Sequence, residues 1–462
     1  MRALLLALLF LPAAGSSLAG SFRLQPDGGG DFPALQTAFE VLSGGEPDTL
    51  WLADGVFTGP GNWELYAVDF AGLIASASAD PGRCTLDFAG HEIGQAFGGA
   101  LHFVDLRFTR QTNELRAYGA ALSFTRCVFE DGGSIASSPD EWSPIVLSNC
   151  TTRRLAASAI SSVGLIRIEA CRFEENLSPY SLISGYYIEC RESRFVGNVA
   201  GGSLLRVIGS DELPGKLIVA DCAFLGNAAG ACVELRDAGT GSVRDCSFAG
   251  NGGPLSADIR DGEDFGTHSL AIASSIFAFR EDGVVLQRGG SSSPVSIACC
   301  DVFGNAGGDW VGDLAPFGGI NGNLAADPLF CDWLAGDLTL FDTSPCLPAN
   351  NACGVLIGAE GQGCTDPTAA PAAPGGGLRL AALPNPFNPK ARFVFSLPAA
   401  SAVQLAVFDA AGRRVATLLD GAPRPAGEQA IAWDARGLAS GVYLARLEAA
   451  GRRQEIKLTL LR

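Results

Sequence analysis

The sequence predicts an all-β protein in which a solenoid of short parallel strands is followed by a small C-terminal β-sandwich. The composition is the first observation, because 59 glycines, one methionine and 18% charged residues describe a turn-rich chain rather than a helical one. The second is a six-residue repeat in the middle of the chain. The third is a change of pattern after residue 378, and 462 residues are enough for two or more domains.

The repeat has the form Cys-x-Phe-x-x-Asn. Complete copies begin at Cys171, Cys222 and Cys246, and near-copies begin at Ser193 and Cys300. Weaker copies begin at Cys127, Cys150 and Ser275, and successive starts lie 21 to 29 residues apart. An elastic period in this range is typical of a solenoid whose coils combine short strands with variable turns.

Residues i and i+2 of a strand point to the same face, so the cysteine and phenylalanine of each copy should face the interior together. We therefore predict a stacked aromatic core formed by Phe173, Phe195, Phe224 and Phe248. The asparagine falls where the strand ends, and stacked coils would align these amides into a structural hydrogen-bonded ladder of Asn176, Asn198, Asn227, Asn251 and Asn305. The cysteines of the repeat are interpreted as core packing.

The first 19 residues are predicted to be a signal peptide. Arg2 supplies the positive charge, residues 3–14 form a short apolar stretch, and Ser17-Leu18-Ala19 fits a cleavage site after Ala19. The apolar run is too short to span a hydrocarbon layer of ~30 Å, and the mature chain has no candidate transmembrane segment. We therefore expect export, and the resemblance of residues 379–462 described below implies a secreted or cell-surface protein of a bacterium with an outer membrane.

Residues 20–364 resemble the right-handed parallel β-helix (pectin lyase-like) family. Residues 25–38, QPDGGGDFPALQTA, are similar to the N-terminal segment with which the family's β-helix begins. Residues 321–330 and Ser344-Pro345-Cys346 are similar to the segment with which it ends. Apolar residues spaced by three or four over 32–42 predict an amphipathic helix that caps the first coil, with Asp31 as its N-cap. Residues 48–55 are expected to form the first strand and its turn.

Residues 365–378 are rich in proline, alanine and glycine and are predicted to be a linker. Residues 379–462 contain short alternating strands with frequent turns, which indicates an Ig-like β-sandwich. This part resembles the type IX secretion sorting domain and the Ig-like domain of flagellar hook-capping proteins. The resemblance implies export machinery as a partner, recognised through a sorting motif that includes Leu383, Pro384, Asn385, Pro386, Phe387, Gly441 and Tyr443.

The distribution of charge along the chain restricts the classes of ligand that it can bind. The chain carries a net charge of −17, but residues 379–462 contain 12 basic and 6 acidic residues, so the rest carries −23. An acidic body argues against nucleic acid and against anionic polysaccharides as partners. No cofactor or metal is predicted. Four cysteines off the repeat are expected to form two disulfides in an oxidising environment, with zinc as the alternative: Cys331, Cys346, Cys353 and Cys364.

No catalytic residue is predicted, because the signatures of pectin esterases, polygalacturonases and pectate lyases are missing. His91, His102 and His268 show no Ser or Cys partner pattern in the sequence. Two further groups of side chains are interpreted as surface features. An acidic loop of Asp258, Asp261, Glu263 and Asp264 has catalysis or calcium binding as its alternative, and the aromatics Trp142, Tyr180, Tyr186 and Tyr187 have sugar stacking as theirs.

The sequence thus favours a non-catalytic surface protein with an adhesive, glycan-binding or structural role. The alternative is a polysaccharide lyase or glycoside hydrolase whose site lies on the variable turns. A groove along the coils in which two or three Asp, Glu, Lys or Arg residues converge would favour the enzyme.

Overall fold

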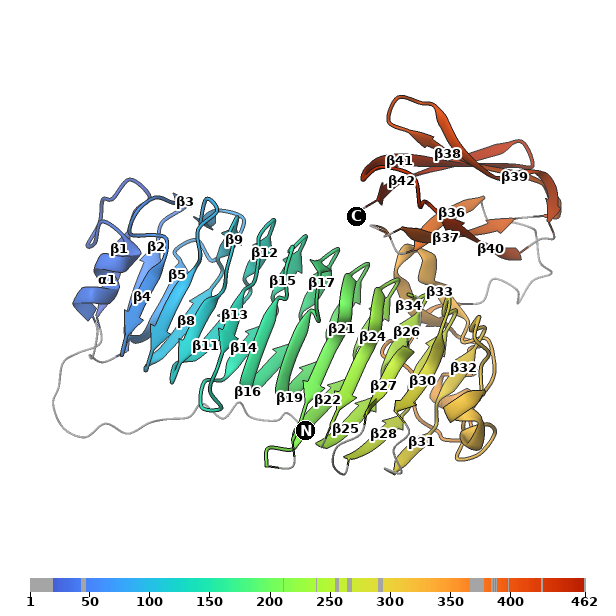
Figure 1. Cartoon of the computed structure of the whole chain (residues 1–462), viewed down its shortest axis with the longest axis horizontal. Helices are drawn as coiled ribbons and strands as arrows, with labels where there is room; N and C mark the ends of the chain where they lie inside the picture. The colour runs from blue at the N-terminus through green and yellow to red at the C-terminus, as the bar shows by residue number, and fades with distance from the viewer. Residues whose placement is uncertain are drawn as a thin grey trace.

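Figure 1 shows the computed structural model of the chain, an elongated solenoid with a small sandwich against its C-terminal part. The structure describes residues 20–460 except 43–46, 211, 238, 254–256, 264–267, 290–293, 366–377, 384, 386, 388, 398 and 425–426. The predicted signal peptide, most of the predicted linker, and Pro384 and Pro386 lie outside the described residues. The described chain is all-β and forms a parallel β-solenoid followed by small sheets, which confirms the predicted fold class.

One side of the solenoid is a sheet of short parallel strands. Its eleven strands within the described residues are β3 (Gly55–Phe57), β6 (Cys84–Asp87), β9 (Arg107–Thr109), β12 (Val128–Glu130), β15 (Thr151–Arg153), β17 (Arg172–Glu174), β20 (Arg194–Val196), β23 (Ala223–Leu225), β26 (Ser247–Ala249), β29 (Ile276–Ala278) and β32 (Asp301–Phe303). The repeat phenylalanines are in register from β17 to β29, and their ring centroids lie 4.6 to 4.9 Å apart. This column is the centre of the core.

The remaining two sides belong to one large parallel sheet, because several of its strands continue around the corner between them. The first strand is β1, which precedes the expected first strand, β2. The strands are β1 (Ser21–Leu24), β2 (Asp48–Leu52), β4 (Leu65–Val68), β5 (Ala71–Ser76), β7 (Gly94–Phe97), β8 (Ala100–Val104), β10 (Leu115–Tyr118), β11 (Ala121–Thr125), β13 (Ala136–Ser138), β14 (Ile145–Ser148), β16 (Ile160–Glu169), β18 (Leu177–Ser178), β19 (Ile183–Arg191), β21 (Val199–Ile208), β22 (Gly215–Ala220), β24 (Ala228–Arg236), β25 (Gly239–Arg244), β27 (Ala257–Glu263), β28 (His268–Ala273), β30 (Val284–Gly289) and β31 (Val295–Ala298).

The repeat cysteine is placed by a tight turn. The residue before each repeat cysteine or serine has a positive φ between 48° and 56°. The thiol then donates to the carbonyl two residues back, as from Cys222 to Ala220 at 3.1 Å, and the hydroxyl of Ser193 donates to Arg191 at 2.7 Å. A small side chain with one donor suits this corner, which explains why serine replaces cysteine in some coils.

The asparagines form a ladder at the other end of the short strands, interrupted at Arg280 between Asn251 and Asn305. Asn198 Oδ1 accepts from the backbone N–H of Asn176 at 3.1 Å, and its Nδ2 donates to the carbonyl of Phe173 at 2.8 Å. Asn227 makes the corresponding bonds with Asn198 and Phe195. Asn251 and Asn305 also donate to phenylalanine carbonyls. The ladder satisfies backbone groups that the turn would otherwise leave buried and unpaired.

The N-terminal helix α1 (Leu35–Leu42) packs Leu35, Ala38 and Phe39 onto the first coils. The predicted N-cap is wrong. Asp31 instead accepts from the backbone N–H of Arg23, and the N–H of Leu35 is capped by Asn62 Oδ1 at 3.1 Å. The capping oxygen therefore comes from the next coil rather than from the residues just before the helix.

After β32 the chain folds back along the outer face of the short-strand sheet. This part contains η1 (Gly312–Phe317), β33 (Phe330–Asp332), η2 (Trp333–Ala335), β34 (Asp337–Phe341), η3 (Pro348–Asn350) and β35 (Gln362–Cys364). We call residues 330–364 the closing segment. Its apolar side chains cover Leu225, Ala249 and Ile276, whereas the outward positions of β9 to β17 carry arginine, glutamate and threonine except at Val128.

The closing segment contains disulfide-bonded cysteines, but the predicted set is wrong at Cys346. The two disulfides are Cys331–Cys364 and Cys299–Cys353. Cys346 is a buried free thiol that donates to Asp301 Oδ2 at 3.5 Å. Cys299 occupies the positive-φ turn position before Cys300, and its Cα lies 6.0 Å from that of Cys353. Three of the four predicted cysteines are therefore disulfide-bonded, and Cys299 takes the place of Cys346.

The C-terminal domain consists of two small antiparallel sheets. One contains β36 (Arg379–Leu383), β37 (Lys390–Leu397) and β40 (Gly427–Asp434), and the other β38 (Ser401–Asp409), β39 (Arg414–Arg424), β41 (Gly441–Ala449) and β42 (Arg452–Leu460). Asn385 clamps β42 by donating to the carbonyl of Lys457 and accepting from the N–H of Thr459. Phe387 is buried against Trp433, and the Tyr443 hydroxyl donates to the carbonyl of Ala439. The described part of the motif thus stabilises the sandwich.

Candidate functional site

A groove follows the turns just after the asparagine ladder. It consists of two hollows that share Ala156. The polar hollow, of about 730 Å³, includes Arg110, Gln111, Thr112, Asp131, Gly132 and Arg154. The small-residue hollow, of about 530 Å³, includes Ser178, Ala200, Gly201, Ala229, Gly230 and Gly253. Together they run across the coils from Ala89 to Gly253, so the groove suits an extended ligand.

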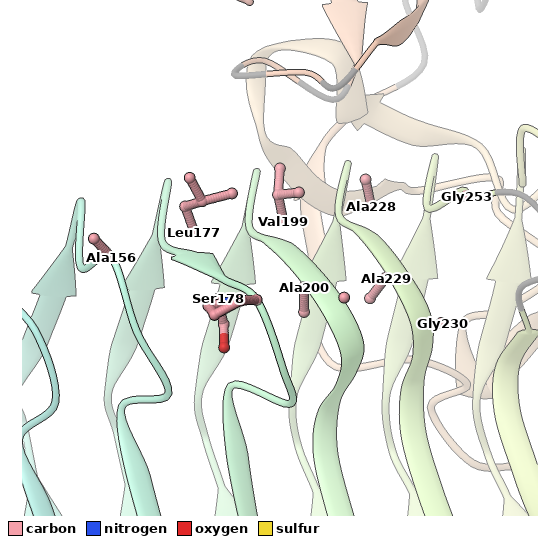
Figure 2. A pocket seen from close by; sticks show the side chains of 11 residues that line it. Ala156, Leu177, Ser178, Val199, Ala200, Ala228, Ala229, Gly230 and Gly253 are labelled. Atoms are coloured by element: carbon pink, nitrogen blue, oxygen red, sulfur yellow. The ribbon is translucent and has the colours of Figure 1, made fainter. Parts of the chain in front are cut away.

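The small-residue hollow exists because neighbouring coils approach backbone to backbone. A Cβ on Gly201 would lie 2.3 Å from the carbonyl oxygen of Pro179, and one on Gly230 would lie 3.0 Å from that of Gly202. Figure 2 shows Leu177, Val199 and Ala228 in one row, with Ser178, Ala200 and Ala229 in the row below. Glycine is therefore required at these two positions by stacking, and with the neighbouring alanines it leaves an uncharged floor.

The charges of the polar hollow are paired between adjacent coils. Arg110 binds both carboxylate oxygens of Asp87, and Arg154 binds both of Asp131 at 2.7 and 2.9 Å. The hydrogen bond from Arg110 lowers the pKa of Asp87, and the one from Arg154 lowers the pKa of Asp131. Both carboxylates are therefore ionised at neutral pH, and the four charges sum to zero.

Gln111 stands at the ladder position of its coil, three residues after Phe108. Its amide is closed off from solvent, and neither its oxygen nor its nitrogen has a partner among the described residues. A Cβ on Gly132 would lie 2.4 Å from Gln111 Oε1, so the longer side chain occupies the space that the glycine leaves. The amide belongs to the solenoid interior and does not line the solvent side of the groove.

The predicted acidic loop is not a loop. Asp258 and Asp261 lie on strand β27, and both are buried. Asp258 Oδ1 accepts from Arg280 Nη1 at 2.7 Å, and Asp261 forms an ion pair with Arg288 at 3.4 Å. Burial raises the pKa of Asp258, and Arg280 lowers it in part. The side chain of Glu263 and all of Asp264 lie outside the described residues.

The structure gives two histidines partners that the sequence did not suggest. His102 Nδ1 lies 2.5 Å from Ser123 Oγ across adjacent strands, and His91 Nδ1 lies 3.0 Å from Glu64 Oε1. His102 and Ser123 lie on the outer face of the large sheet, where the backbone N–H groups are hydrogen-bonded to the neighbouring strands. A seryl nucleophile there has no backbone donors for an oxyanion. The side chain of His268 is not described.

The four aromatics considered for sugar stacking are dispersed. Trp142 and Tyr180 are 79% and 74% exposed on separate loops. Tyr186 lines a small hollow of about 210 Å³ beside Ser184, while the ring of Tyr187 lies beneath Lys216 Nζ at 4.8 Å. None of them lines the groove. In the described part of the chain, no group of three or more His, Cys, Asp or Glu residues could hold a metal ion.

Comparison with known proteins gives little beyond the fold. No protein-family model and no curated protein matches the chain. Two solved structures are similar to it. A mutant tailspike protein of E. coli bacteriophage HK620 is 10% identical, with 92% of this chain and 88% of that chain covered and a TM-score of 0.29. The same tailspike in complex with a pentasaccharide is 10% identical, with 96% and 80% covered and a TM-score of 0.22.

These similarity values are too low to support a family or a functional argument. The resemblances to pectin lyase-like proteins and to sorting domains therefore remain predictions from the sequence. Among the described residues, no helix is long and apolar enough to cross a membrane.

Proposed function

We propose that the chain is an exported surface protein that binds an uncharged, extended polysaccharide in the groove, without cleaving it. The observation that carries this proposal is the neutral groove: its arginines are each bound by a carboxylate, and the rest of its lining is uncharged. A polyanion would need unpaired positive charge, and the net −23 outside residues 379–462 repels it at long range.

The repeated geometry favours a polymer as the ligand. Successive coils present equivalent backbone groups at a spacing of about 4.8 Å. Hydroxyl groups of a neutral sugar can donate to the carboxylates and accept from the guanidinium and Thr112 groups at the groove surface. Export rests on the signal-peptide pattern, and the C-terminal sandwich is proposed to engage the sorting machinery.

Catalysis is the second candidate, because Arg110, Asp131 and Arg154 do converge in the groove. Glycoside hydrolysis needs one carboxyl group that is protonated at working pH and another that is ionised. Asp87 and Asp131 both have lowered pKa values, so neither supplies the acid. The paired charges therefore favour binding over bond cleavage.

The test uses the mature chain, residues 20–462, on an array of neutral and anionic polysaccharides. Ala156→Trp would obstruct the point where the two hollows meet, and Ala271→Trp, at another exposed alanine on β28, is the matched control. We expect a neutral glycan to bind the wild type and the control but not Ala156→Trp. Binding of polyanions alone, or undiminished binding by Ala156→Trp, would refute the proposal. Release of reducing ends would favour the enzyme.

A further inference from the structure

The sandwich makes sparse contacts with the solenoid. Arg392 Nη1 donates to the carbonyl of Phe279 at 3.3 Å, and a Cβ on Gly197 would lie 3.5 Å from the carbonyl oxygen of Asn385. Arg392 also interacts electrostatically with the buried Glu281 of the solenoid. Further contacts of the sandwich involve the closing segment. Arg379 pairs with Asp332, and Val394 joins the apolar cluster beneath that segment. The position of the sandwich therefore depends on the closing segment.

The closing segment is held on the solenoid by a short set of polar contacts and one apolar cluster. Backbone N–H groups donate from Gly358 to the carbonyl of Ser274 at 2.8 Å and from Ala359 to Ser247 Oγ at 3.0 Å. Arg194 donates to the carbonyl of Gly336 at 2.6 Å and pairs with Glu360. The apolar part includes the parallel rings of Phe279 and Trp333, 5.0 Å apart.

Covalent bonds complete this attachment. Cys331–Cys364 joins β33 to β35 and so closes the segment into a ring. Cys299–Cys353 ties that ring to a turn of the solenoid. All four cysteines are partly exposed, whereas the ten other cysteines are buried free thiols. Thiol–disulfide exchange at the surface can therefore reach both bonds of the attachment while the core thiols stay protected.

We infer that the two disulfides form a redox latch that docks the closing segment, and through it the sandwich, on the solenoid. This inference deepens the proposed function, since it rests on export from a reducing to an oxidising compartment. Before oxidation the sandwich is free to meet the export machinery; afterwards it is docked. In the reverse direction, a dithiol gives two electrons to each disulfide, leaves two protein thiols and is itself oxidised to a disulfide.

The test compares the purified mature chain before and after dithiothreitol treatment. Titration of unfolded samples should give 10 thiols before reduction and 14 after it. Amide hydrogen exchange of residues 330–364 is expected to accelerate at least tenfold on reduction, because the segment then opens locally, while β17 to β29 stay protected. Small-angle X-ray scattering should show a larger maximum dimension as the sandwich moves away.

The double variant Cys299→Ser/Cys353→Ser should exchange like the reduced protein without any reductant, and Cys346→Ser is the control in the same segment. Unchanged exchange and scattering after full reduction would overturn the latch. So would loss of protection throughout the solenoid, because the disulfides would then hold the whole fold. Neither readout depends on export or on glycan binding, so the latch and the proposed function can fail separately.

Discussion

Arg280 Nη1 donates a hydrogen bond of 2.7 Å to Asp258 Oδ1, and the side chains are only 1% and 2% exposed. Arg280 stands where the asparagine ladder would place an amide, between Asn251 and Asn305, and its backbone N–H still donates to Asn305 Oδ1 at 3.0 Å. The amide series is thus interrupted at Arg280, whose backbone N–H keeps only the bond to Asn305 while its side chain pairs with a buried carboxylate. We know of no signal in the sequence that identifies this pair.

Replacing Arg280 with alanine should therefore be strongly destabilising. The change leaves Asp258 buried and without its cation, and we expect a loss of about 3–5 kcal/mol in the free energy of unfolding, measured with urea. Arg83→Ala removes the exposed pair with Asp54 and is the matched control, with an expected effect below about 1 kcal/mol. Equal losses for the two variants would contradict the assignment.

The ladder itself can be tested at Asn227. Its Oδ1 accepts two hydrogen bonds from Asn198, and its Nδ2 donates to the carbonyl of Phe195 at 2.8 Å. Asn227→Ala leaves these buried groups without partners, so we expect a loss of about 2–4 kcal/mol in thermal or urea unfolding. The exposed Asn113→Ala should change stability by less than about 0.5 kcal/mol. A negligible effect at Asn227 would mean that water replaces the amide.

The phenylalanine column predicts a cavity effect. Phe224 is fully buried, with the rings of Phe195 and Phe248 at 4.9 and 4.6 Å on its two faces. Phe224→Ala is expected to lower the free energy of unfolding by about 3–5 kcal/mol, because the neighbouring coils cannot collapse fully into the space. Tyr180→Ala, at an exposed ring, should cost less than about 0.5 kcal/mol. A loss below about 1 kcal/mol at Phe224 would show that the core repacks.

Asp301 predicts a pH dependence. Burial raises its pKa to about 6. Because the folded state binds this proton more tightly than the unfolded chain does, the contribution is full below about pH 4 and is lost as the pH rises through about 6. The free energy of unfolding of the wild type minus that of Asp301→Asn should therefore fall by about 2 kcal/mol between pH 4 and pH 7, measured by urea unfolding. A constant difference across this range would contradict the raised pKa.

Export is tested by deleting residues 379–462. If the sandwich carries the sorting signal, the truncated chain should accumulate inside the outer membrane, with its surface labelling reduced at least tenfold. Far-ultraviolet circular dichroism of the purified truncated chain checks that its solenoid still folds. Surface labelling equal to that of the full chain would reject the sorting role and favour a plain Ig-like domain.

Much of the fold could be predicted because the repeat is local. In Cys-x-Phe-x-x-Asn the strand period places Cys222 and Phe224 inside, and the phase of Asn227 places its amide at the turn. The sequence also indicated where the sandwich begins, since alternating strands follow a proline-rich stretch. The groove was not predictable in the same way, because one hollow is lined by alanine and glycine residues that carry no chemical pattern and the other by ion pairs formed between coils.

The sequence by itself determined the solenoid, its inward-facing rings and its amide ladder, because each depends on spacing within one coil. Tertiary structure alone decided which groups meet between coils. Coil lengths vary, so no fixed offset leads from Cys299 to Cys353, from Leu35 to its cap at Asn62, or from Arg280 to Asp258. Such partners are brought together by stacking, and stacking is set by the three-dimensional register of the coils rather than by any local pattern.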